Sequence, residues 1–406
     1  MNLTPIVKSS AGLDVHLKII VVTLLKEQPD GTIQDTVKEF STFPAELAKL
    51  ASWLKSENVE LAVMESTGVY WRSVFEALEA AGVKAYVVNA KHVKQVPGKK
   101  TDVSDSKWLA TLARYGLVKA SFIPEKYLRE LRLVTRYRAK LKSTIASEIN
   151  RMHKILNDSG MRLGLVFSDI QCVSAQDIVD GLINSESVDL LITKLRGISK
   201  RKEKELRLVL AQPLSETHKF LLKSIREHII SLHKSCKELD DKIFAFMKPY
   251  NKQWEILQTI PGIDALAAAV IIAEIGVDMQ QFGSSEQFCS WAGICPGNNE
   301  SAGKRKSAKT VKGSPSLRRI LCEVANAATK TTSQFKSYYK AMQIRRGHKR
   351  SIIASGHKIL RVIFTLLTNM KGYFDPNVDY EALLVKKNAP RWIQCLTKYG
   401  YLTRTN

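Results

Sequence analysis

The sequence predicts an α/β domain at its amino end and a mostly helical remainder. Residues 11–90 alternate runs of β-branched residues with amphipathic stretches, the pattern of strands and helices that share one sheet. Residues 124–251 instead repeat apolar side chains every three to four positions among charged ones, which predicts long helices. Beyond them, Pro261 and Gly262 separate two further helical patterns.

Each element of the α/β part follows from a local pattern. Residues 11–25 predict one strand, residues 32–41 pair with it across the turn QPDG, and a third strand between them is left open. The next elements are an amphipathic helix at 43–56, a buried strand at 59–67, a helix at 71–81 that Gly82 ends, and a strand at 84–90. A further helix opens within KTDVSDSKWLATL, residues 100–112.

Composition narrows the class. The 406 residues have 45% hydrophobic content and a mean hydropathy of −0.13, which suffices for two or three domains with their own cores. No apolar run approaches the ~18 to 20 residues that cross a bilayer, and the amino terminus lacks the apolar core of a signal peptide, so we expect no membrane partner. The six cysteines form no CxxC pair, which predicts reduced thiols in a cytosol.

The formal net charge of +23 and the pI near 9.7 predict a polyanionic partner. Residues 301–371 hold 17 Lys or Arg and one acid, so this segment carries +16 of that charge. A second basic stripe within residues 126–154 has helical spacing and one sign of charge, which favours contact with phosphates over simple solvation. This stripe consists of Arg129, Arg132, Arg136 and Lys140.

Four acids stand out in the α/β part. Asp102 and Asp105 share one face at the start of a helix, where acids alone are more simply explained as helix-terminal charges. Asp14 interrupts an apolar strand and Glu65 ends another, and each alone fits a hydrogen-bonded rim residue. Together the four form an oxygen-ligand set suited to Mg²⁺ or Mn²⁺. Two such ions would clamp the attacking and leaving oxygens of a phosphodiester.

The motifs GLDVH, MESTGVYW and KTDVSDSKWLATLARYGL, in this order, resemble the DEDD transposases of the bacterial insertion-sequence one-ten group. The resemblance covers roughly residues 8–124. It implies a ribonuclease-H-like first domain similar to the RuvC Holliday-junction resolvase, with Thr101 as the helix cap. The matching acids, which it implies are catalytic and metal-binding, are Asp14, Glu65, Asp102 and Asp105.

The carboxy-terminal part resembles the same transposases. In FCSWAGICPGNNESAGKRKSAKTVKGSPSLRRILCEVANA an apolar segment ends in Pro and Gly, and a serine, a basic run and a helix start follow. The serine that matches the family's nucleophile is Ser301, although Ser307 and Ser314 are chemically equivalent. The expected nucleic-acid contacts in this segment are Lys304, Arg305, Lys306, Lys309, Lys312, Arg318 and Arg319. The Pro261-Gly262 turn resembles a phosphate-gripping helix-hairpin-helix, or it is a plain αα-turn.

These patterns divide the chain into four parts. They are a RuvC-like DEDD metal-binding domain at 1–124, a helical spacer or coiled coil for nucleic-acid binding and dimerisation at 125–250, a transposase domain with the serine loop at 251–372 and a helical tail at 373–406. A spacer that packs on itself and a dimerising coiled coil are equally compatible with the middle part.

The resemblance implies an RNA-guided DNA recombinase. The metal domain of one subunit and Ser301 of another would form a composite site that cuts and rejoins donor and target DNA through a covalent phosphoserine. A structured bridge RNA would select both DNA sites by base pairing. The implied assembly is a dimer or a tetramer, in a bacterial cytoplasm and at the nucleoid.

Two alternatives stay open. A RuvC-like nuclease or Holliday-junction resolvase would use the same acids with water in place of the serine. A non-enzymatic nucleic-acid-binding protein would use only the basic segment. The four ordered acids argue against this second alternative, because a passive phosphate binder gains nothing from negative charge without a cation between.

Overall fold

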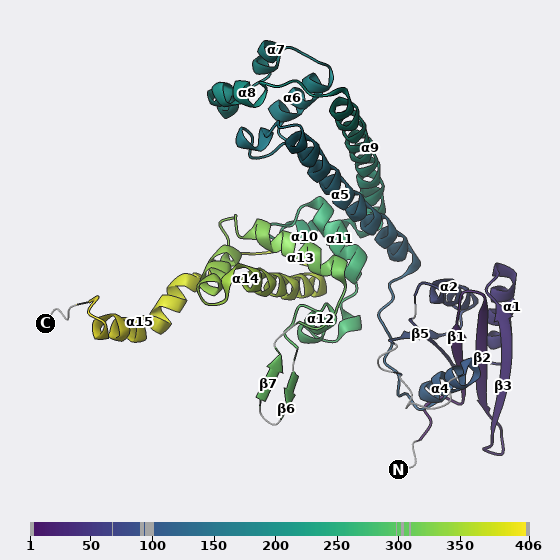
Figure 1. Cartoon of the computed structure of the whole chain (residues 1–406). Helices are drawn as coiled ribbons and strands as arrows, with labels where there is room; N and C mark the ends of the chain where they lie inside the picture. Colours follow the sequence, from purple (N-terminus) through teal and green to yellow (C-terminus); the bar gives the residue numbers. More distant parts are fainter. Residues whose placement is uncertain are drawn as a thin grey trace. The chain divides into compact units, whose positions relative to one another are not determined.

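The computed structural model describes residues 4–66, 68–89, 93, 101–297, 299–301, 304–307 and 310–402. Within the hairpin segments 299–301 and 304–307 it describes the backbone. The chain divides into two compact units, Met1–Ile123 and Pro124–Asn406 (Figure 1).

The first unit is built on a mixed five-stranded sheet with the order β3-β2-β1-β4-β5. The strands are β1 (Ser9–Val15), β2 (Ile19–Glu27), β3 (Ile33–Ser41), β4 (Leu61–Glu65) and β5 (Ala85–Val88). β1 and β3 each run antiparallel to β2, whereas β4 is parallel to β1 and β5 is parallel to β4. This confirms the α/β domain that the sequence predicts.

The single strand expected at 11–25 is wrong, because the chain reverses between β1 and β2. The His16 N–H donates to the Ile19 carbonyl oxygen at 3.0 Å and closes the turn, with Leu17 exposed at its tip. No Gly or Pro marks this reversal, so the β-branched residues on both sides read as one continuous run. The third strand that was left open is therefore real.

Helices cover both faces of the sheet. They are α1 (Pro44–Ser56), α2 (Trp71–Ala81) and α4 (Asp102–Arg114). Buried side chains of α1 and α2, such as Leu50 and Leu78, pack with Leu13 on one face. Leu109 of α4 packs with Val63 on the other face. Side chains of a strand alternate between its two faces, so odd-numbered residues of β1 face α1 and α2 and even-numbered ones face α4.

The backbones of β1 and α4 touch at Gly12. A Cβ atom there would lie 1.9 Å from the Ser106 carbonyl oxygen and 2.4 Å from the Ala110 nitrogen, so only glycine fits. Two buried hydrogen bonds hold the contact. The Ser10 hydroxyl donates to the Ala110 carbonyl oxygen at 2.9 Å, and the Thr23 and Ser106 hydroxyls lie 2.7 Å apart.

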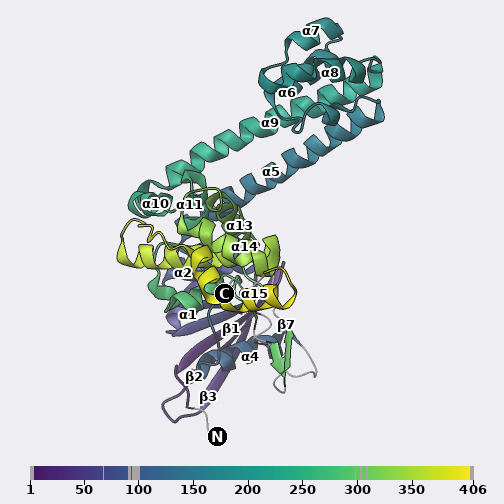
Figure 2. The ribbon, with the colours of Figure 1, turned by 90° about the vertical axis from the view of Figure 1, so that its left-hand side faces the viewer.

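The second unit begins with two long helices, α5 (Lys126–Asp158) and α9 (Glu216–Phe246). They are antiparallel, because Arg138 pairs with Asp240 while His218 lies against Asp158. Figure 2 shows the smaller helices gathered at one end of this pair. They are α6 (Val173–Ile183), α7 (Val188–Thr193) and α8 (Glu203–Val209), with 3₁₀ turns at Leu163–Leu165 and Gly197–Lys202.

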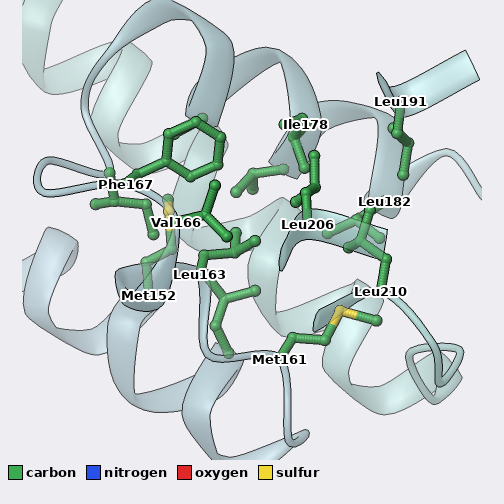
Figure 3. Close-up of a cluster of buried hydrophobic side chains, with 14 of the residues drawn as sticks. Met152, Met161, Leu163, Val166, Phe167, Ile178, Leu182, Leu191, Leu206 and Leu210 are labelled. Atoms are coloured by element: carbon green, nitrogen blue, oxygen red, sulfur yellow. The ribbon is translucent and has the colours of Figure 1, made fainter. Parts of the chain in front are cut away.

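A dense apolar cluster joins these small helices to α5. Met152 of α5, Leu163, Ile178 of α6 and Leu206 of α8 are among its fully buried members (Figure 3). The long helices therefore pack on each other within one chain, as the self-packing spacer predicts, and dimerisation through them stays a prediction.

The rest of the second unit is mostly helical. Its elements are a 3₁₀ turn (Lys248–Tyr250), α10 (Asn251–Gln258), α11 (Ala265–Ile275), a 3₁₀ turn (Gln280–Phe282), α12 (Ser285–Trp291), the hairpin β6 (Asn299–Ser301) and β7 (Lys304–Ser307), α13 (Pro315–Ala328), α14 (Gln334–Asn369) and α15 (Tyr380–Lys398). α14 breaks at Gly347, where φ is 71° and ψ is 170°.

One apolar stretch corrects the prediction that no apolar run approaches the length needed to cross a bilayer. α14 contains an 18-residue window that matches a membrane-crossing helix in length and composition. Its residues Ile359, Leu360 and Ile363 are fully buried, and Gly356 of the same helix lies against Leu321 of α13. Part of this apolar run therefore packs inside the second unit, and 44% of the window is buried there.

Replacing Gly12 with Ala tests the contact between β1 and α4. The added Cβ overlaps backbone atoms that cannot rotate away, so Gly12→Ala is expected to destabilise the first unit by roughly 1–3 kcal/mol. Calorimetric unfolding would measure the loss. Gly164→Ala is the matched control, because Gly164 faces open space at an ordinary φ. Equal melting temperatures for wild type and Gly12→Ala would contradict this account.

Candidate functional site

The sheet register places two of the predicted acids side by side. Leu13 of β1 pairs with Met64 of β4, so Asp14 and Glu65 follow at the carboxyl ends of two adjacent parallel strands. Alternation puts both on the face that Gly12 presents to α4. In open α/β sheets this edge is where ligands bind.

The start of α4 is capped without its two aspartates. The Thr101 hydroxyl accepts from the Ser104 N–H at 3.1 Å, and the Ser104 hydroxyl accepts from the Thr101 N–H at 3.0 Å. This reciprocal pair satisfies the helix end, as a capping box does. Thr101 is therefore confirmed as the cap, and neither Asp102 nor Asp105 is required for that role.

Three side chains converge at this edge. The His16 Nε2 atom lies 3.2 Å from Asp14 Oδ2 and 3.6 Å from Asp102 Oδ2, and the ligand atoms of all three lie within 4.8 Å of one another. The Asp14 side chain is 19% exposed, whereas His16 and Asp102 are about half exposed. Two carboxylates and one imidazole at this spacing fit a divalent cation.

Asp105 also influences Asp14 electrostatically. Burial raises the pKa of Asp14 above its ordinary value, His16 opposes this shift, and the negative charges of Asp102 and Asp105 raise it further. Asp102 and Asp105 thus both act on Asp14. Asp105 and half-buried Glu65, which ends the neighbouring strand, are not part of the three-residue cluster. A bound cation would relieve this crowding of negative charge.

Sequence reasoning gave His16 no role. The available signal was its position two residues after Asp14, since alternate residues of an extended chain point to the same side. In the single strand expected at 11–25, Asp14 and His16 would both lie within the sheet, so the sequence did not place His16 at the edge where β1 ends.

The Gly- and Ser-rich loop contains a two-stranded hairpin. Ser301 lies opposite Lys304 in the backbone register, Glu300 opposite Arg305, and Asn299 opposite Ser307. Lys306 lies on the same strand as Arg305, and Lys309 falls outside the described residues. The predicted nucleophile is therefore next to the hairpin turn, with cationic residues on the paired strand.

Ser314, one of the alternative serines, has a structural role. Its hydroxyl donates to Glu274 Oε2 at 2.9 Å and accepts from the Leu317 N–H at 3.3 Å, which caps α13. Because both its donor and an acceptor position are engaged, Ser314 is a poorer nucleophile candidate than Ser301 or Ser307.

Most of the basic stripe on α5 faces protein. Arg136 makes two bonds of 2.9 Å to the carboxylate of Glu274, whose side chain is 2% exposed. Arg132 donates to the carbonyl oxygens of Ala273 and Glu274 at 2.7 and 2.6 Å. Arg129 donates to the Pro124 carbonyl oxygen at 3.0 Å, and Lys140 is exposed. Arg132 and Arg136 thus secure α5 to the end of α11.

Glu274 joins these helices as an anion. Burial alone would raise its pKa, but the guanidinium groups of Arg136 and Arg132, with the Ser314 hydroxyl, hold the pKa below its ordinary value. The sequence could not reveal this pairing, because Glu274 lies more than a hundred residues from its arginine partners.

The turn between α10 and α11 packs inward. A Cβ atom on Gly262 would lie 2.6 Å from the Ala328 nitrogen of α13. The Asp264 carboxylate accepts from the Ala267 N–H at 2.7 Å and so caps α11 itself. Both contacts fit the plain αα-turn better than a phosphate grip.

Two family models match the chain. Residues 11–160 match a transposase model of the DEDD type found in IS110 elements, and residues 254–340 match a model described as the transposase IS116/IS110/IS902 family. A "Probable family 20 transposase" of Pseudomonas aeruginosa is 25% identical over 159 residues, which are 38% of this chain and 46% of that protein. The matched stretch thus spans less than half of the relative's length.

Two solved structures also align. Thermus thermophilus RuvC aligns at 16% identity with a TM-score of 0.22, over 28% of this chain and 99% of that one. T. thermophilus RuvC in complex with a Holliday junction substrate aligns at 15% identity with a TM-score of 0.21, over the same shares.

The sheet, the acidic cluster at its edge and the two family matches define a DEDD-type transposase. The amino-terminal and carboxy-terminal matches name the same group, in the order the sequence resemblance implies. The chain belongs to the IS116/IS110/IS902 family of transposases.

Removing one ligand tests the metal centre. Asp14→Asn keeps the shape of the side chain but removes its charge, so Mn²⁺ affinity is expected to fall at least tenfold. Isothermal titration of the full chain with MnCl₂ would measure this. His153→Ala, on α5 of the second unit, is the control and should leave the affinity unchanged. Equal affinities for wild type and Asp14→Asn would exclude this cluster as the metal site.

Replacing Glu274 with Gln tests the buried ion pair. The change leaves Arg136 with a neutral partner and is expected to cost roughly 1–3 kcal/mol, less than a fully enclosed pair because Arg136 is partly exposed. The low folded-state pKa means that this stabilisation exists above the unfolded pKa and disappears as the pH falls through the folded one. Urea unfolding would measure the difference, with the exposed Glu323→Gln as control.

Proposed function

We propose that this chain is a metal-dependent enzyme that cuts and rejoins DNA strands by phosphoryl transfer. The observation that carries the proposal is the convergence of Asp14, His16 and Asp102 at the carboxyl edge of the sheet. Family membership supports DNA as the substrate, and the net charge of +23 supports a polyanionic partner.

The acids of the first unit would hold Mg²⁺ or Mn²⁺. Asp14 and Asp102 would supply oxygen ligands, and His16 lies within reach of the same ion. Asp105, in the first turn of α4, and Glu65, on the strand next to Asp14, would complete the set. When bound, such an ion stabilises charge on the phosphate and on the leaving oxygen.

We assign the nucleophile to Ser301. Its hydroxyl would attack a phosphodiester phosphorus and give a phosphoserine, with one DNA strand end as the leaving group and the hydroxyl proton passed to a base. The cation-rich strand opposite Ser301 favours an attacked phosphate at this position, and the engagement of Ser314 removes one competitor. The acids of one subunit and the serine of another would act on the same DNA.

An exposed basic cluster on α14 supports DNA binding. Every residue from 343 to 350 is exposed, and the segment surrounds the helix break at Gly347. Its cations are Arg345, Arg346, Lys349 and Arg350. None of these four forms an ion pair with an acid in the part of the chain that the structure describes. Unpaired cations at such density attract phosphates through counterion release.

The structured guide RNA and the homo-oligomer, a dimer or a tetramer, belong to the same proposal. They rest on the resemblance of the motifs to guided recombinases and on a positive charge large enough for two nucleic acids. Copurification of a defined RNA with the full chain would support the guide.

The competing function is a nuclease that uses water in place of Ser301. One observation favours it. The cluster of Asp14, His16 and Asp102 lies within the first unit, and metal-dependent cleavage by water at this cluster needs no serine. A nuclease would leave free DNA ends, whereas a serine recombinase passes through a protein-linked strand.

Ser301→Ala separates these two functions. The recombinase predicts that the covalent protein–DNA band on a denaturing gel disappears, while Mn²⁺ and DNA affinity stay at wild-type values. Ser307→Ala, on the paired strand, is the matched control and should keep the adduct. Undiminished strand cleavage by Ser301→Ala would establish the nuclease instead.

A further inference from the structure

We propose that Arg318 is a positioning residue that fixes the base of the hairpin bearing Ser301, and that it does not bind DNA. The inference rests on the proposed function in one respect, since it takes Ser301 as the nucleophile. It corrects the expectation that Arg318 neutralises the attacked phosphate.

The guanidinium of Arg318 joins the outgoing and returning arms of the hairpin segment. Its Nη2 atom donates to the Gly293 carbonyl oxygen at 2.5 Å, before the hairpin, and to the Thr310 hydroxyl, after it. Pro296 and Thr310 also form an antiparallel backbone bridge. One side chain of α13 therefore closes the neck of the segment from which β6 and β7 extend.

Below this neck the two arms touch through their backbones. A Cβ atom on Gly293, where φ is 72°, would lie 2.4 Å from the Gly313 nitrogen. A Cβ atom on Gly313 would lie 2.2 Å from the Ala292 carbonyl oxygen. Only glycine at both positions permits this approach, so the arms enter and leave at one fixed point.

The helix that carries Arg318 is itself held in place. Ser314 caps α13 and donates to buried Glu274 of α11, which in turn pairs with Arg136 of α5. Arg318 thus projects from a frame of three helices. A side chain whose own support is rigid can position a distant group within the small tolerance that catalysis requires.

The neighbouring Arg319 shows the contrast. Arg319 is exposed, and its ion pair among the described residues is with Glu323, one helical turn away, at 3.7 Å. Arg318 is half-buried and its described bonds are to protein oxygens on the hairpin neck. Two adjacent arginines of the predicted phosphate-binding set therefore have different surroundings, and Arg319 is the more exposed of the two.

Positioning of this kind matters because a two-stranded hairpin is marginally stable alone. Ser301 lies next to the hairpin turn, so its place relative to a bound phosphate depends on how firmly the base is held. A displacement of about 1 Å at a reacting atom costs on the order of 100-fold in rate.

The test compares Arg318→Ala with Arg319→Ala in the full chain. Binding of a fluorescent 40-base-pair DNA duplex is measured from 50 to 300 mM NaCl, and hydrogen exchange is measured for residues 294–297 and 310–314. Arg318→Ala is expected to raise exchange in these segments at least tenfold and to keep the wild-type salt slope. Arg319→Ala is expected to leave exchange unchanged and, as a phosphate contact, to reduce the slope by about 0.9.

A second pair of variants separates the clamp from a general loss of folding. Thr310→Val removes the hydroxyl that Arg318 holds and should raise exchange in the same segments, whereas Thr310→Ser keeps the hydroxyl and should behave as wild type. Unchanged exchange in both Arg318→Ala and Thr310→Val, or a reduced salt slope in Arg318→Ala, would overturn the proposal.

Adduct formation links the clamp to the chemistry. If wild type forms the protein–DNA adduct, Arg318→Ala should form it about 100-fold more slowly at unchanged DNA affinity, and Thr310→Ser should retain the wild-type rate. If Ser301→Ala proves that no adduct passes through this serine, the proposed function fails, while exchange and salt slope still decide whether Arg318 holds the hairpin.

Discussion

The close contact between the backbones of β1 and α4 is the constraint on which the candidate metal centre depends. At Gly12 the strand and the helix approach too closely for any side chain, and contacts along the pair place Ser10 at Ala110 and Gly12 at Ser106. Two residues of strand and four of helix cover nearly the same length, about 6 Å. One more step along both elements brings Asp14 to Asp102, which is where the structure places them.

The second unit uses a similar device for a different purpose. Close glycine contacts fix the neck of the serine hairpin, and the ion pair between Glu274 and Arg136 fixes the helices that support it. Several arginines that the sequence predicted to contact nucleic acid therefore bond to protein groups. They are Arg132, Arg136 and Arg318. The exposed cluster around Gly347 has no such partners among the described residues, so the distribution of acids decides which cations remain available for phosphates.

Local signals in the sequence predicted much of the first unit. The helices, the sheet class and the cap at Thr101 follow from periodicity and short-range hydrogen bonding. What the sequence missed depends on distant partners or unmarked turns. The reversal after Val15 has no Gly or Pro, and the inward direction of Arg136 depends on Glu274. From the sequence, Arg318 was expected to bind phosphate. Its partners are a backbone carbonyl and a hydroxyl, and because neither is charged, nothing in the sequence indicated that they would engage the guanidinium.

The central claim is that one divalent cation binds where β1 and α4 converge. The most direct measurement is anomalous diffraction at the manganese edge from crystals of the full chain grown with MnCl₂. The account predicts a peak within about 2.0–2.3 Å of carboxylate oxygens from both Asp14 and Asp102. A peak bound only elsewhere, or well-ordered carboxylates there without any peak at saturating Mn²⁺, would contradict it.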